Sequence, residues 1–127
     1  MEDAFNQKID LLLNRITTDK RWDLDNETLF VVMGMTYYGY CLGYGKLVCM
    51  QDNVTVNKAV VQRLVALGAG TKYTEGLVDA AEQSFFQQEE NLYNQLVNIG
   101  HNYFMMDEWE ELIDNIYDNT ITLMEQK

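Results

Sequence analysis

Residues 28–45 read TLFVVMGMTYYGYCLGYG and contain no charged side chain. The run is close to the shortest length that can span a bilayer as a helix. Tyrosines lie in its middle, however, whereas a membrane helix keeps tyrosine near its ends; they are Tyr37, Tyr38, Tyr40 and Tyr44. We therefore predict a helix that is buried on most sides in a protein core, and we expect no contact with a membrane.

This helix can begin at a cap formed by Asp25 or Asn26 and run towards Met50. At 100° per residue its small residues fall on two opposite sides, so other helices can approach it closely from two directions. One side carries Gly34, Cys41 and Gly45, and the other carries Gly39 and Gly43. We expect a glycine-containing central helix, which glycine weakens enough to allow a kink near Gly43.

The chain contains no proline, so nothing of that kind interrupts long helices on either side of this segment. Apolar residues recur at helical spacing in four further segments, which we predict as helices. They cover residues 3–18, 56–67, 74–99 and a last segment that starts after Asp107. The fold class is therefore all-α: a compact bundle of about five helices in a single domain, residues 1–127.

The predicted helix ends rest on short polar and glycine signals. Asn53 or Thr55 can cap the third helix, and Gly68 is placed to end it in a left-handed conformation. Gly100 is expected to stop the fourth helix. Asp107 can cap the last helix, with Glu110 three residues later as in a capping box.

The net charge of −11 arises from 20 acidic and 9 basic residues. Nucleic-acid binders need positive charge to displace the counterions of phosphates, so we expect no direct nucleic-acid binding. Anionic membrane surfaces are disfavoured for the same reason. If the protein has a charged partner, a basic protein is favoured, although net charge also serves plain solubility.

Cys41 and Cys49 fall eight residues apart on one predicted helix. Their Cα atoms would be about 12 Å apart, which is too far for a disulfide. Reduced thiols and an acidic N-terminus without an apolar run indicate a cytoplasmic protein. His101 is the only histidine, and we expect it to serve a helix end rather than a metal. We expect no cofactor.

The fourth predicted helix carries two neighbouring apolar faces. The second face consists of Phe86, Tyr93 and Val97, and acidic residues surround it: Glu75, Asp79, Glu82, Glu89 and Glu90. Another helix of the bundle can cover this face. Alternatively, aromatic anchors inside a charged rim are typical of a protein interface, either with a basic partner or in a homodimer.

The last predicted helix carries an acidic stripe opposite its apolar face. Its members project within about 60° of one another; they are Asp107, Glu111, Asp114 and Asp118. The stripe is either a solvated face or a ladder of carboxylates that a basic cleft would accept. Repulsion along such a ladder would be relieved by a basic partner.

One enzymatic alternative is a magnesium-dependent helical nucleotide pyrophosphohydrolase. Such enzymes place carboxylates three residues apart on facing helices, as Glu111 and Asp114 are spaced, with Glu89 and Glu90 able to face them. The paired acidic motif is incomplete, because Tyr93 stands where a further glutamate is expected. No nucleophile motif is present, and neither cysteine has a cationic neighbour in sequence.

These patterns favour a small acidic, non-enzymatic binding protein that docks on a basic protein surface, possibly that of a nucleic-acid-binding enzyme. Phage and mobile-element inhibitors are of this character, including anti-CRISPR and anti-restriction proteins, as are immunity proteins that block toxins. No motif of the chain links it to any of them. The hydrolase and a structural or regulatory homo-oligomer are the alternatives.

Overall fold

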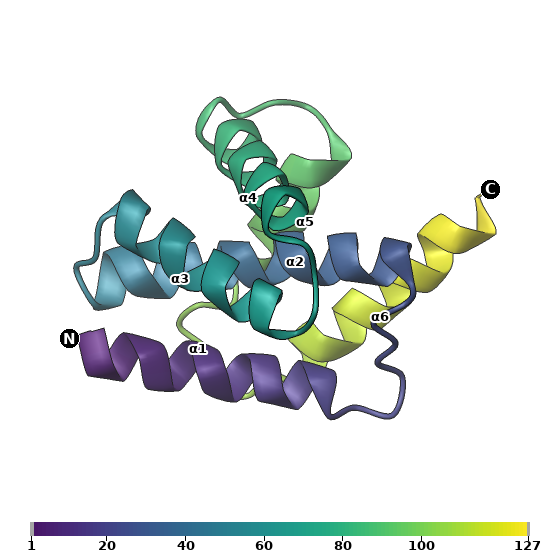
Figure 1. Cartoon of the computed structure of the whole chain (residues 1–127), viewed down its shortest axis with the longest axis horizontal. Coiled ribbons are helices and arrows are strands. Elements are labelled where there is room, and N and C mark those ends of the chain that lie inside the picture. The colour runs from purple at the N-terminus through teal and green to yellow at the C-terminus, as the bar shows by residue number, and fades with distance from the viewer. Residues whose placement is uncertain (1, 127) are drawn as a thin grey trace.

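The computed structural model describes residues 2–126, and side chains from residue 3 onwards. Within that range the chain is helical and has no strand. Figure 1 shows α2 crossing the middle of the molecule, α1 below it and the α4–α5 pair above it. The elements are α1 (Glu2–Thr17), α2 (Glu27–Gly43), the π-helical turn η1 (Tyr44–Val48), α3 (Asn53–Ala66), α4 (Thr71–Phe86), α5 (Leu92–His101) and α6 (Glu110–Glu125).

The charge-free segment forms α2, and it is buried on most sides as predicted. Every residue from Leu29 to Gly43 is buried except Val31, and α2 packs against α3, α4, α5 and α6. Asn26 caps the helix by accepting a hydrogen bond from the Leu29 backbone N–H at 3.1 Å. Among the described helices, none is both long and apolar enough to cross a membrane.

Two glycines let α2 and α5 cross with their backbones in contact. A Cβ added at Gly39 would collide with the carbonyl of Val97, and one added at Gly100 would collide with the carbonyl of Thr36. Each glycine therefore faces a carbonyl that lies three residues before the other glycine. Gly100 was expected to stop a helix, but α5 continues through it to His101, so its role is close packing.

The helical pattern changes at Gly43, where a kink was expected. The next residues form the π-helical turn η1, in which the Cys49 N–H donates to the Tyr44 carbonyl at 3.0 Å. A Cβ at Gly45 would lie 2.7 Å from a Val56 methyl and 2.8 Å from the Phe5 ring. The turn thus brings the end of α2 against α1 and α3.

The single helix predicted for residues 74–99 is wrong, because the chain forms α4 and α5 there. Gln88 has a φ of 52°, which ends α4, and the Asn91 side chain caps α5 by accepting from the Asn94 N–H at 2.8 Å. Asn91 also donates to the Glu89 carboxylate at 2.9 Å. No glycine or proline marks this break. The described chain therefore has six α-helices rather than five.

Two predicted helix starts are also corrected. Asp52, rather than Asn53 or Thr55, caps α3 and accepts from the Thr55 N–H at 2.8 Å. Asp107 does not cap α6, which begins at Glu110 without a side-chain cap. The end of α3 is as predicted, because Gly68 has a φ of +116°.

The apolar stripe predicted for α1 is buried throughout: Phe5, Ile9, Leu12, Leu13 and Ile16. Buried tyrosine hydroxyls attach this helix to its neighbours. The hydroxyl of Tyr37 on α2 donates to the Ile9 carbonyl at 2.9 Å, and that of Tyr117 on α6 donates to the Ile16 carbonyl at 2.6 Å. Cys41 and Cys49 are free and buried, as the spacing argument predicted.

Candidate functional site

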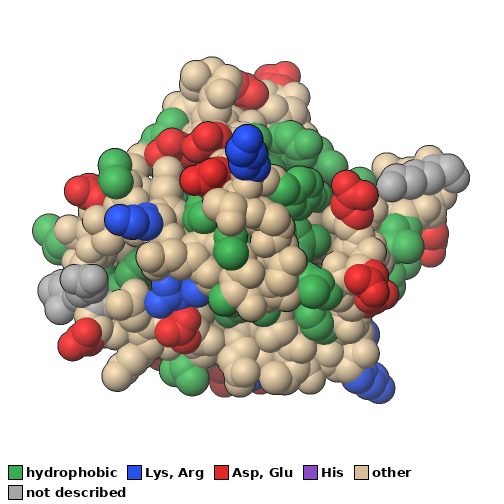
Figure 2. Space-filling model, viewed as in Figure 1, with side chains coloured by type: hydrophobic (Ala, Val, Ile, Leu, Met, Phe, Trp, Pro, Cys, Tyr) green, Lys and Arg blue, Asp and Glu red, His purple; other side chains and the backbone are tan. Residues whose placement is uncertain are grey.

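The structure separates the residues predicted to form one interface on residues 74–99. Glu75, Asp79 and Glu82 follow one face of α4; the first two are exposed, and Glu82 accepts from the Asn53 amide at 3.2 Å. Figure 2 shows acidic side chains gathered over α4 on its α3 side, and hydrophobic side chains on the side towards α6. The acidic face of α4 therefore does not surround Tyr93, which lies on α5.

Phe86 and Tyr93, the two predicted aromatic anchors, belong to different surfaces. Phe86 ends α4, where the Lys46 ammonium lies 4.9 Å from its ring centre. Glu89 is engaged by Ser84 and Asn91 in the following turn, and Glu90 is exposed. The third member of the set, Val97, is buried in the core, so it is unavailable to a partner.

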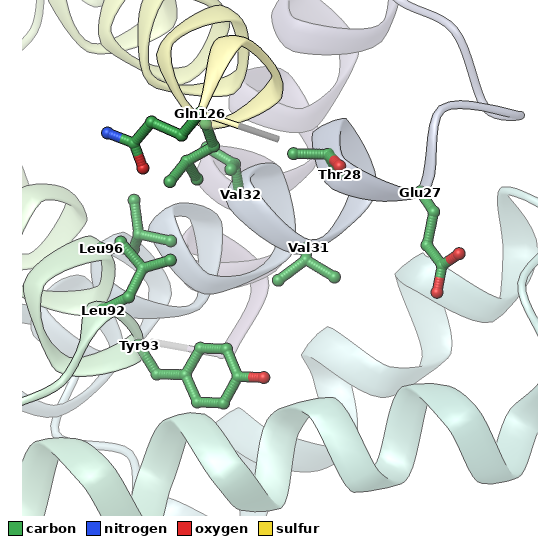
Figure 3. A pocket seen from close by; sticks show the side chains of 9 residues that line it. Glu27, Thr28, Val31, Val32, Leu92, Tyr93, Leu96 and Gln126 are labelled. Carbon is green, nitrogen blue, oxygen red and sulfur yellow. The ribbon is translucent and has the colours of Figure 1, made fainter.

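Tyr93 instead lines an open hollow of about 570 Å³ between α2, α5 and the end of α6. Figure 3 shows the Val31 side chain pointing into this hollow from α2, with Tyr93 on the α5 side. The lining is mostly apolar, and polar groups stand at its ends. The lining residues are Glu27, Thr28, Val31, Val32, Leu92, Tyr93, Leu96, Leu123 and Gln126.

Two further hollows of about 340 Å³ each extend this surface along α2. One shares Val31 and Tyr93 with the first hollow and reaches α4 at Lys72 and Tyr73. The other shares Glu27 and Tyr73 with its neighbours and is lined by Leu24, Asp25, Phe30 and residues 68–70. Because the linings overlap, we treat the three hollows as one surface, the α2 groove.

The groove combines an apolar floor with a polar end. Burial raises the pKa of Tyr73, and the nearby Glu27 carboxylate and Tyr93 hydroxyl add to the rise. These groups therefore converge where α2, α4 and α5 meet. Asp25 and Glu27 give this end negative charge, and Lys72 on α4 supplies a cation close by. Apolar recognition with a few convergent polar groups is typical of a binding site.

The acidic stripe predicted on α6 is largely paired within the molecule. Asp107 precedes the helix and lies 3.5 Å from the Lys8 ammonium. Asp114 lies 3.0 Å from the Arg21 guanidinium, and Glu111 accepts from the Tyr103 hydroxyl at 2.6 Å. Asp118 is exposed. Most of the stripe thus faces basic and hydroxyl groups of the same chain, which weakens its case as a ladder for a basic cleft.

The carboxylates of the hydrolase alternative do not converge. Glu111 and Asp114 have the separate partners given above, and Glu89 is tied to the turn after α4. Across the described part of the chain, no group of three or more His, Cys, Asp or Glu side chains is arranged to hold a metal ion. The geometry therefore supplies no magnesium site for that alternative.

The remaining reactive side chains are embedded in apolar surroundings. His101 is the last residue of α5 and lies between two rings, with centroids 5.0 Å from Phe85 and 5.3 Å from Phe104; burial lowers its pKa. Burial also raises the pKa of the Cys41 thiol strongly. A buried thiol with a raised pKa is not an activated nucleophile.

Arg21 joins the turn after α1 to α6 and should make the fold sensitive to acid. Its guanidinium donates two hydrogen bonds to Asp19, at 2.8 and 2.9 Å, and these lower the pKa of Asp19 from 3.8 to about 2. A lowered folded-state pKa stabilises the protein above the unfolded-state pKa, and this stabilisation is lost as pH falls.

We expect Asp19→Asn to reduce stability at neutral pH, with the difference from wild type closing as pH falls from about 4 to about 2. Urea unfolding midpoints measured across this range test the effect. Asp118→Asn, an exposed site on α6, is the control and should leave the wild-type profile nearly unchanged. A difference that stays constant down to pH 2 would contradict the role of the Asp19 carboxylate.

Of the groove residues, the sequence analysis identified Tyr93 alone. The floor was missed because Val31 lies inside a run of buried residues, and because Leu92 and Leu96 were assigned to the core of a longer helix. Comparisons with family models, curated proteins and solved structures find no match to this chain. The function must therefore be inferred from the geometry of its surfaces.

Proposed function

We propose that the protein is a non-enzymatic binding protein that docks on a basic partner protein through the α2 groove. The observation that carries the proposal is the open, mostly apolar groove, bordered by Asp25 and Glu27. It extends over three joined hollows, a shape that suits an apolar protein segment, such as one face of a helix. Leu92 and Tyr93 remain well exposed at its edge.

The charge of the chain supports a basic partner. The net charge of −11 attracts a basic protein over long range and speeds the encounter. The exposed carboxylates of Glu75 and Asp79 on α4 add to this field. A protein of this kind can act as an inhibitor by covering a functional surface of its target, and a reducing cytoplasm would keep both of its thiols free.

A matched pair of aromatic truncations tests the groove. Tyr93 and Phe86 have similar exposed fractions, 41% and 46%, but only Tyr93 lines the groove. We expect Tyr93→Ala to weaken binding to the partner by about tenfold or more, because a partly buried aromatic anchor is lost. Phe86→Ala should change it little.

The measurement is a capture experiment from lysate of the native host at low salt, with the wild type and both variants immobilised. A single basic protein should elute from the wild type and from Phe86→Ala at the same salt step, and from Tyr93→Ala earlier. If Phe86→Ala alone weakens capture, the interface lies at the end of α4. Capture that is indifferent to salt would argue against a basic partner.

A further inference from the structure

A second apolar surface lies at the opposite end of α2 from the groove. Residues 47–54 include four exposed hydrophobic side chains: Leu47, Val48, Met50 and Val54. The most exposed are Met50 at 79%, Val54 at 75% and Leu47 at 61%. Figure 2 shows hydrophobic side chains at its left edge, where Figure 1 places the turn between α2 and α3. Such clusters on a protein surface often mark an interface.

The backbone holds Met50 outward in an unfavourable conformation. Its φ of 58° lies in the left-handed region, which residues with a side chain avoid. The surrounding hydrogen bonds fix this turn, since the Gln51 N–H donates to the Gly45 carbonyl at 2.8 Å. The residue also directly follows the π-helical segment, an irregularity that is frequent at functional sites. Strain that is retained around an exposed methionine points to a use for that side chain.

The charges near this segment identify its occupant. Asp52 is the only charged residue within 47–54, and its carboxylate is used to cap α3. Lys46 and Lys58 flank the segment. A basic partner therefore finds little to attract it here, and an anionic membrane is repelled by the net charge of −11. A second copy of this chain meets the least repulsion at this nearly neutral surface.

We propose that the protein forms a two-fold symmetric dimer through Leu47, Val48, Met50 and Val54. In such a dimer the same patch of both copies meets, so the apolar side chains cover one another. Lys46 and Lys58 of each copy then face the acidic surface of the other. The groove lies along the first half of α2, so the dimer leaves both grooves open.

Sedimentation equilibrium of the full chain, over a range of concentrations, tests the dimer. The wild type should approach twice 14.8 kDa. Its dimerisation should strengthen from about 0.1 M to about 1 M salt, where the Debye length falls to about 3 Å and repulsion between the acidic copies is screened. Binding of a basic partner has the opposite salt dependence, so the two interactions can be told apart.

Met50→Gly separates the interface from the fold. Glycine favours the backbone conformation at this position, so the variant should unfold at the same or a higher urea concentration. It should nevertheless raise the dimer dissociation constant at least about tenfold, because one buried methionine is lost from each copy. Gln88→Gly is the matched control: it relieves a φ of 52° outside the patch and should leave dimerisation unchanged.

Val54→Lys provides a second disruption, at a site exposed enough to tolerate a charge. It should give a monomer at every concentration that dimerises the wild type. A wild type that stays monomeric in both salts overturns the proposal. So does a dimer that neither Met50→Gly nor Val54→Lys weakens, because its interface would then lie elsewhere.

Discussion

Gly100→Ala is expected to lower the free energy of unfolding by about 3 kcal/mol, at the upper end of the usual range for overpacking. An added Cβ would lie 2.9 Å from the Tyr40 backbone nitrogen and closer still to the Thr36 carbonyl. Both atoms belong to the backbone of α2, so no side-chain rotation can relieve the collision. The two helices must separate, and the side chains packed around their crossing must lose contact.

Gly76→Ala is the control for this prediction. Gly76 is also a glycine inside a helix, but a Cβ added there meets nothing within 4 Å. Alanine should therefore stabilise α4 by about 0.5–1 kcal/mol through its helix propensity. Urea unfolding of the two variants should shift in opposite directions. Equal and small effects would show that α2 and α5 do not cross in backbone contact at Gly100.

The signals that were legible in the sequence are those that act locally. Thr28–Gly45 lacks charge, and this alone predicts the burial of α2. Asn26 is a strong cap, and Gly68 is the residue that tolerates a left-handed helix end. Each of these effects depends on a few consecutive residues, so no knowledge of the rest of the fold is needed.

The division between α4 and α5 could not be read in the same way. It is made by Gln88, a residue with no special preference for a positive φ, together with hydrogen bonds among Ser84, Glu89 and Asn91. Apolar periodicity continues across the break, so a single helix was the natural prediction. The error moved Phe86 and Tyr93 onto one predicted face, whereas the structure places them on separate surfaces.

The groove was hidden for a related reason. Helical spacing shows which side of a helix is apolar, but it cannot show that a neighbouring helix leaves part of that side uncovered. Val31 illustrates this limit, because it has the same character as the buried residues around it and differs only in what α4, α5 and α6 leave open. Gly100 is a second example, since its partner Thr36 is distant in sequence.

Val31→Lys is expected to weaken binding of the partner by about a hundredfold, because it alters the centre of the groove. Val31 belongs to two of the joined hollows, so a lysine there puts a charge where the proposed interface is driest. The new ammonium also lies one helical turn after Glu27, an arrangement that favours an ion pair. The variant should therefore keep its fold and lose both the apolar floor and the nearby negative charge.

Ile121→Lys is the matched control, since it makes the same change of charge at a position 52% exposed on α6 and outside the groove. It should leave partner binding nearly unchanged. Titration calorimetry with the captured partner measures both affinities, and thermal unfolding monitored by circular dichroism verifies the fold. If both lysines weaken binding equally, long-range charge rather than the groove determines affinity. If neither does, the interface lies elsewhere, and the acidic face of α4 becomes the surface to mutate, because its carboxylates at Glu75 and Asp79 remain exposed.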